Sequence, residues 1–100
     1  MKTGTELIAL ERERQKLRYT SDHDDGEGEL LDAAVAYVDA ASYEPQDYEW
    51  MRREVLDGAW AETGWPQDQF RPKHTAIENL VIAGALIAAE IDRLQHLNAK

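Results

Sequence analysis

Cysteine is absent from this 100-residue chain, and serine is scarce. Without cysteine the chain has no disulfide, no thiolate metal ligand and no cysteine nucleophile. Its two serines, Ser21 and Ser42, stand in no nucleophile-elbow motif, and no glycine-rich phosphate loop is present. The sequence therefore gives no support to nucleophilic or P-loop catalysis. The lack of cysteine is typical of a reducing compartment, and we expect a cytoplasmic protein.

Long hydrophobic runs are also missing. The longest runs from Leu80 to Ala89, whereas about 18 or more apolar residues are needed to span a bilayer. With 43% hydrophobic and 31% charged residues, the composition is typical of a globular protein. The length allows one domain, residues 1–100, with a modest core.

The net charge of −9 is concentrated in one part of the chain. Residues 19–49 hold ten acidic side chains and no Lys or Arg, whereas residues 1–18 have a balance of +2 and residues 50–100 a balance of −1. An acidic surface repels phosphate backbones and anionic lipids. We therefore expect no direct binding to nucleic acid or membrane, and a partner protein with a basic surface.

The hydrophobic spacing predicts an all-α fold, a compact bundle of three to four helices at about 3–18, 27–41, 45–60 and 75–97. Capping boxes at Thr3-Gly4-Thr5-Glu6 and Thr75-Ala76-Ile77-Glu78 predict two of the helix starts. Pro45 suits a first helical position, and the prolines and glycine of 62–73 indicate a loop.

Two helices show a clear apolar face. In the second helix it consists of Leu30, Ala34, Tyr37, Val38 and Ala41. In the fourth it consists of Ile77, Leu80, Gly84, Ile87, Ile91 and Leu94. Because the fourth helix is apolar all round between Leu80 and Ala89, we predict a long, central, apolar C-terminal helix, or alternatively a homodimer interface.

The acidic stretch has two functional interpretations. As an interaction surface it comprises Asp22, Asp24, Asp25, Glu27, Glu29, Asp32, Asp39, Glu44, Asp47 and Glu49. As part of a Mg²⁺ or Mn²⁺ site, the ligands would be His23, Asp24, Asp25, Glu29, Glu90 and Asp92. Acidic residues at a helix start are also stabilised by the helix dipole without any ligand, in which case no cofactor is expected.

A partial resemblance supports the metal alternative. Small all-α nucleotide pyrophosphohydrolases of the MazG type hold Mg²⁺ between an E-x-x-E on one helix and an E-x-x-D on another. Glu29-Leu30-Leu31-Asp32 is similar to the second half, and the chain contains no E-x-x-E. The resemblance implies a metal-dependent nucleotide hydrolase or a nucleotide-binding protein.

Large aromatic residues occur in and beside the predicted loop: Trp60, Trp65 and Phe70. Trp is favoured at binding hot spots, so the three could form an aromatic contact surface. In the alternative interpretation they fold back and close one end of a small core.

A second resemblance covers nearly the whole chain. It rests on five segments: Glu11-Arg12-Glu13-Arg14-Gln15, His23-Asp24-Asp25, Gly28-Glu29-Leu30, Trp65-Pro66, and Ala83-Gly84-Ala85-Leu86-Ile87-Ala88-Ala89-Glu90-Ile91-Asp92-Arg93-Leu94. These resemble a family of small, acidic, functionally unassigned helical proteins of tailed phages and prophages. The resemblance implies a phage accessory protein that acts by protein–protein contact. We expect an acidic mimic of nucleic acid that inhibits a host defence complex such as CRISPR–Cas.

Overall fold

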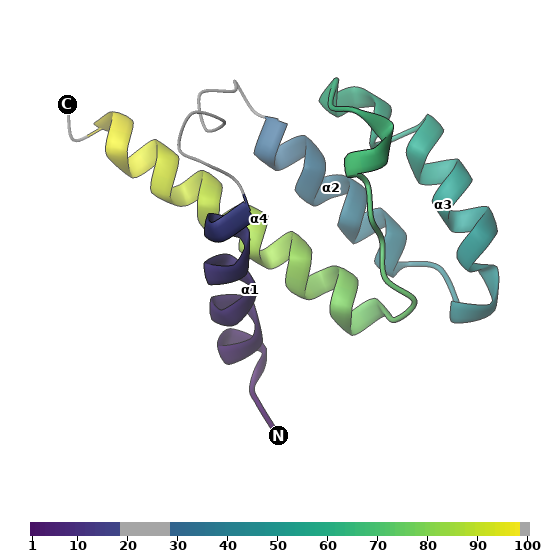
Figure 1. The fold of residues 1–100 in the computed structure, drawn as a ribbon, viewed down its shortest axis with the longest axis horizontal. Coiled ribbons are helices and arrows are strands. Elements are labelled where there is room, and N and C mark those ends of the chain that lie inside the picture. Colours follow the sequence, from purple (N-terminus) through teal and green to yellow (C-terminus); the bar gives the residue numbers. More distant parts are fainter. Residues whose placement is uncertain (19–28, 99–100) are drawn as a thin grey trace.

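The computed structural model describes residues 1–18 and 29–98, and these form an all-helical fold (Figure 1). The four α-helices are α1 (Gly4–Arg18), α2 (Glu29–Ala41), α3 (Tyr48–Asp57) and α4 (Ala76–Asn98). Three short 3₁₀ turns join them: η2 (Pro45–Asp47), η3 (Ala61–Thr63) and η4 (Gln67–Gln69). The predicted fold class and its long C-terminal helix are confirmed.

The predicted capping box at Thr3 forms in full, whereas at Thr75 the Glu78 carboxylate accepts from the threonine hydroxyl instead of the backbone N–H. The backbone N–H of Thr3 donates to Glu6 Oε1 (2.9 Å) and that of Glu6 donates to Thr3 Oγ1 (3.2 Å). The hydrogen bond from the Thr3 backbone is the main cause of a lowered pKa at Glu6. Before α4 the N–H of Glu78 donates to Thr75 Oγ1 (3.2 Å), and the Thr75 hydroxyl donates to Glu78 Oε1 (2.9 Å).

The helix predicted over 45–60 is divided into η2 and α3. Pro45 opens the 3₁₀ turn instead of the α-helix. At the other end Gly58 leaves the helical region, with φ −106° and ψ −100°. The N–H of Trp60 then reaches back to the carbonyl oxygen of Val55 (2.8 Å). Trp60 is consequently turned into the core after the helix has ended.

Helix α4 is central, because both α1 and α2 pack against it. In Figure 1, α2 lies alongside α4, while α1 and the chain between Gly64 and Thr75 lie on the near side of these two helices. The Cα atoms span 46 × 35 × 19 Å, and the shortest extent corresponds to about two layers of helix. The α1–α4 contact is close at Gly84, where a Cβ would come within 2.6 Å of Ile8 Cδ1.

The core combines alanines with a small group of large side chains. Its buried residues include Ala33, Ala34, Ala36, Tyr37, Ala40, Met51, Val55, Trp60, Phe70, Ile82, Ala83 and Leu86. The Tyr37 ring lies 6.1 Å from that of Trp60 and 5.3 Å from that of Phe70. Trp60 and Phe70 therefore close one end of the core, and these two do not form the exposed contact surface of the first interpretation.

The predicted apolar face of α4 is not the face that the structure buries. Ile77, Leu80, Ile87, Ile91 and Leu94 are exposed, whereas the buried residues of α4 are Asn79, Ile82, Ala83, Ala85, Leu86, Ala89 and Glu90. On α2 the prediction is right for Ala34 and Tyr37 and wrong for Val38. The physical reason is that small residues let the helices approach closely, so alanine stripes form the contacts and the larger aliphatic stripes remain outside.

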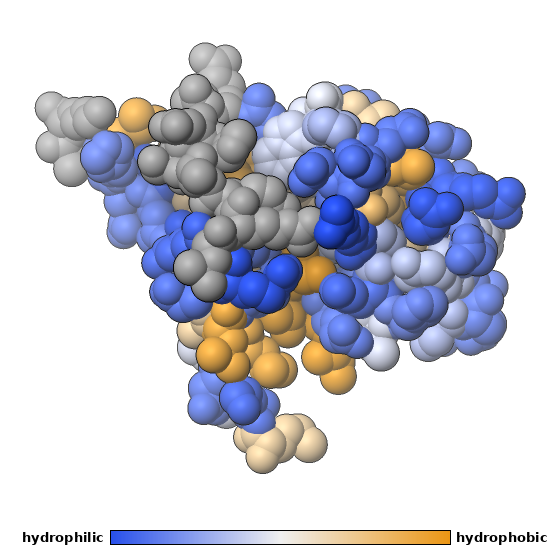
Figure 2. Space-filling view, in the orientation of Figure 1, coloured by the Kyte–Doolittle hydropathy of each residue, from blue (hydrophilic) through white to orange (hydrophobic). Residues whose placement is uncertain are grey.

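The near side of the molecule is mainly hydrophilic. Figure 2 shows charged and polar surface over most of this side, with hydrophobic surface gathered beside the N-terminal half of α1. No described helix combines the length and hydrophobicity that crossing a membrane requires.

Candidate functional site

The predicted acidic surface is only partly described. Asp22, His23, Asp24, Asp25 and Glu27 lie outside the described residues. The others follow the chain from α2 to the start of α3: Glu29, Asp32, Asp39, Glu44, Asp47 and Glu49. The carboxylate of Glu49 lies 3.9 Å from Arg52, so the α3 end of this surface is mixed in charge.

The two late carboxylates of the metal alternative are already bound to arginines. Glu90 is buried and accepts hydrogen bonds from Arg93 Nε (2.7 Å) and Nη2 (3.0 Å), which lower its pKa against the opposing effect of burial. Asp92 pairs with Arg12 at 3.2 Å, joining α4 to α1. Within residues 1–18 and 29–98 no three His, Asp or Glu side chains form a group that could hold a metal ion.

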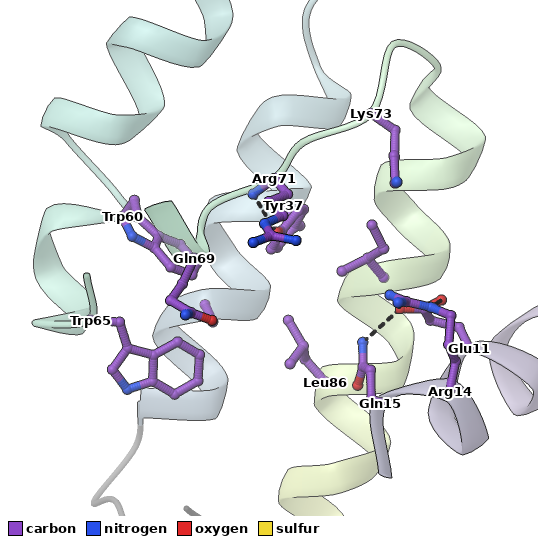
Figure 3. Close-up of a pocket in the computed structure, with 12 residues that line it drawn as sticks. Glu11, Arg14, Gln15, Tyr37, Trp60, Trp65, Gln69, Arg71, Lys73 and Leu86 are labelled. Atoms are coloured by element: carbon purple, nitrogen blue, oxygen red, sulfur yellow. Dashed lines mark hydrogen bonds and ion pairs between the residues drawn. The ribbon is translucent and has the colours of Figure 1, made fainter. Parts of the chain in front are cut away.

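A pocket opens instead on the near side of α2 and α4. It has a volume of about 270 Å³ and draws its walls from α1, α2, α4 and the chain between α3 and α4 (Figure 3). The lining residues are Glu11, Arg14, Gln15, Ala33, Tyr37, Trp60, Trp65, Gln69, Arg71, Lys73, Ile82 and Leu86. Three of these are cations and one is a carboxylate, so the lining carries a positive balance in a chain of net charge −9.

The α1 side of the pocket is a fixed polar cluster. Arg14 donates to both carboxylate oxygens of Glu11, from Nε (2.8 Å) and Nη2 (2.6 Å), and Gln15 Nε2 donates to Glu11 Oε2 (3.1 Å). Burial works to raise the pKa of Glu11, but these hydrogen bonds and the charges of Arg14 and Lys73 outweigh it, so the pKa is lowered. Glu11 is therefore an anion that holds Arg14 and Gln15 in place.

Two further cations reach the pocket because their backbones are anchored to helices. The N–H of Arg71 donates to the Tyr37 hydroxyl of α2 (3.0 Å). Lys73 is held by Asn79 of α4, which accepts from its N–H at Oδ1 (2.7 Å) and donates from Nδ2 to its carbonyl oxygen (2.9 Å). Figure 3 shows the Lys73 side chain extending toward the Glu11–Arg14 pair and the Arg71 guanidinium beside Tyr37.

Aromatic rings form the opposite wall. Trp60 and Trp65 meet edge to face with ring centroids 5.7 Å apart, and Trp60 Nε1 donates to the carbonyl oxygen of Pro66 (3.2 Å). Gly64 turns the chain between them with φ +72°, a backbone conformation that residues with a side chain rarely adopt. In Figure 3 the Trp60 and Trp65 rings and Gln69 face the Glu11–Arg14–Gln15 cluster across the pocket.

Sequence reasoning selected Trp60 and Trp65 but missed the cations of this pocket. Arg71 and Lys73 stand two residues apart beside Pro72, in a chain with few basic residues, and this was the available signal. Arg14 comes from a helix dense in charge, where nothing in the sequence separates it from Arg12 or Lys16. Guanidinium, ammonium and amide donors facing aromatic rings are suited to an anion that carries a planar group.

No family model, no curated protein and no solved structure matches this chain.

Proposed function

We propose that the protein binds a small anionic ligand with a planar ring, of the nucleotide class, in the pocket between α1, α2 and α4. The observation that supports this most directly is the convergence of Arg14, Arg71 and Lys73 on one cavity in a chain of net charge −9. Cations that serve only solubility are expected to be spread over the surface and not gathered around one cavity. Nucleotide binding was also one of the alternatives that the sequence left open.

The two sides of the pocket match the two halves of such a ligand. Guanidinium groups bind phosphate through paired, charge-assisted hydrogen bonds, and lysine adds a point charge. A planar base can pack against the half-buried ring of Trp65. The cavity of about 270 Å³ lies at the small end of the range for ligand sites, so we favour a mononucleotide over a larger molecule.

The proposal is for binding without a chemical step. Among the described residues that line the pocket, Glu11 is the one carboxylate, and Arg14 and Gln15 hold it through hydrogen bonds. This arrangement does not favour the role of a metal ligand or a general base. The metal-dependent hydrolase therefore gains no support from the described residues.

Isothermal titration calorimetry with AMP, ADP, ATP and inorganic phosphate in metal-free buffer tests the proposal. We expect a mononucleotide to bind, and Arg71→Ala and Lys73→Ala to weaken binding by at least about tenfold each, because a charge-assisted hydrogen bond contributes about 1.5–3 kcal/mol. Arg53→Ala is the matched control, since this exposed arginine of α3 lies outside the pocket. Equal affinity in all three variants, or no binding by the parent, would reject the site.

Trp65→Ala separates the two halves of the ligand. If the ring packs on Trp65, this variant weakens mononucleotide binding and leaves the affinity for inorganic phosphate unchanged. If both affinities stay the same, the pocket binds an anion but not a planar group.

A second proposal is that the acidic surface binds a basic surface of a host protein, as the phage resemblance implies. Its support is that Asp32, Asp39, Glu44 and Glu49 are all exposed. Binding should weaken steeply with salt and compete with nucleic acid for the partner. Asp32→Asn with Asp39→Asn should reduce that competition, whereas Lys73→Ala should not, so the two proposals are separable.

A further inference from the structure

The α2–α4 pair has a large apolar face that no described element covers. Seven aliphatic residues on it are each 42–59% exposed. They are Leu31, Val35 and Val38 of α2, and Leu80, Ile87, Ile91 and Leu94 of α4. We name these seven residues the open face.

The open face lies on the side of the helix pair opposite the pocket. Leu31, Val35 and Leu80 each come two residues before a pocket-lining residue, namely Ala33, Tyr37 and Ile82. Two residues turn an α-helix by about 200°, so each pair points to opposite sides. The apolar stripes of α2 and α4 therefore lie on the side of the packed pair away from the pocket and from the chain between Gly64 and Thr75, which Figure 1 shows in front.

The open face is about as large as the largest apolar patches on monomeric soluble proteins. Seven half-exposed aliphatic residues present apolar surface on the order of a few hundred Å², at the upper limit for monomeric soluble proteins. With the polar residues around them, the face approaches the roughly 800 Å² per partner that stable interfaces bury.

The pattern of the open face fits a second copy of the same chain. Along α4 the aliphatic positions Leu80, Ile87, Ile91 and Leu94 are seven, four and three residues apart, which is heptad spacing. This is the repeat with which helices of one kind pack side by side, and a two-fold axis lets one patch be its own partner. None of the seven side chains is charged, so the centre of the contact carries no charge.

We propose that two copies of this chain associate through their open faces, α2 and α4 of one against α2 and α4 of the other, with both pockets facing outward. The proposal does not depend on the pocket having a ligand. It also gives a role to the aliphatic stripe of α4, which is not needed for packing within one chain.

Sedimentation velocity over a range of concentrations tests the association. We expect the parent to sediment at twice 11.4 kDa at micromolar concentration. Val35→Glu and Ile87→Glu should each weaken the dimer at least about tenfold, because they place a charge in the centre of the contact. Leu10→Glu is the matched control: Leu10 is equally exposed but belongs to α1, outside the open face, and this variant should remain dimeric.

Salt distinguishes a second copy from a basic protein on the same face. Asp32 and Asp39 are exposed neighbours of Leu31 and Val38, so two copies bring like charges together and added salt should strengthen the dimer. A basic partner would instead be released by salt. A parent that stays monomeric at low and high salt overturns the proposal, and so does a dimer that Leu10→Glu breaks while Val35→Glu and Ile87→Glu do not. Circular dichroism of each variant confirms that the helices are retained.

Discussion

The two faces of the α2–α4 pair differ in how far their side chains are buried by other parts of the chain. On the pocket side the hydroxyl oxygen of Tyr37 accepts a hydrogen bond from the Arg71 N–H, and its buried ring packs against two others. Two residues earlier, on the opposite side of the same helix, Val35 is 59% exposed. The same contrast separates Ile82 from Leu80 on α4.

This difference shows that most of the large aliphatic side chains of the helix pair do not pack within the chain. Many of the contacts are made by alanines, which bury little apolar area each, while most Leu, Ile and Val residues of α2 and α4 stay in water. The single chain thus relies on the aromatic end of its core and on specific polar contacts. The free energy of burying the open face remains available for association.

The largest expected effect comes from breaking the aromatic end of the pocket side. Trp60 is 2% exposed and contacts Tyr37, Trp65 and Phe70. Trp60→Ala should lower the free energy of unfolding by about 3–5 kcal/mol, measured by urea denaturation at one fixed chain concentration. Trp50→Ala is the control, because Trp50 is 53% exposed, and it should change stability by less than about 1 kcal/mol. Similar losses in both variants would show that the aromatic end is not the main support.

The next effect concerns the α1–α4 contact, which carries the Arg14 side of the pocket. Gly84→Leu should cost about 1–3 kcal/mol, since even a Cβ would come within 2.6 Å of Ile8 Cδ1. Ile8→Ala in the same chain should recover part of that loss by making room, which a double-mutant cycle in urea would measure. Strictly additive effects of the two substitutions would contradict the close approach.

A smaller effect is expected where the loop is anchored to α4. Asn79 is 2% exposed, and its amide makes both hydrogen bonds with the backbone of Lys73. Asn79→Ala should cost about 1–2 kcal/mol, because it removes both hydrogen bonds that hold the backbone of Lys73. It should also weaken ligand binding, whereas Gln67→Ala, on an exposed residue of η4, should do neither. Unchanged stability would mean that the loop is held elsewhere.

Local signals predicted most of this fold. The two Thr–Glu capping boxes, Pro45 and the loop prolines depend on backbone geometry within a few residues, and all of them lie close to the expected boundaries. The helix expected over 45–60 ends at Asp57, and the return of Trp60 to the core decides this end. That return is a tertiary contact, which no pattern within the segment displays.

The buried faces of the helices and the pocket were harder to predict than the helices themselves. The apolar stripe from Leu80 to Leu94 is more hydrophobic than the alanine stripe beside it, so periodicity selects it, although close packing favours the smaller residues. The pocket brings Arg14 together with Arg71 and Lys73 across more than 50 positions of sequence. Only the crossing of α1 over α4 and the anchoring by Tyr37 and Asn79 create that proximity.

The smallest expected effect on stability concerns Glu90 of α4, which is buried beside residues of the open face. The hydrogen bonds from Arg93 lower the pKa of Glu90, so this pair stabilises the fold above the ordinary carboxyl value of 4.5 and loses that contribution as the pH falls through the lowered pKa. Glu90→Gln should therefore be less stable than the parent at neutral pH, by about 1 kcal/mol.

The difference between parent and Glu90→Gln should shrink as the pH falls below 4.5, because a protonated Glu90 resembles glutamine in charge. Arg93→Gln should show the same convergence, since removing either partner ends the same interaction. The measurement is urea unfolding from pH 7 to about pH 3 at one chain concentration, a window set by the lowered pKa. A stability difference that stays constant across this range would show that Glu90 contributes by packing alone. Glu90 would then stabilise the fold as the alanines between the helices do, by packing, and not as the charged groups of the pocket side do.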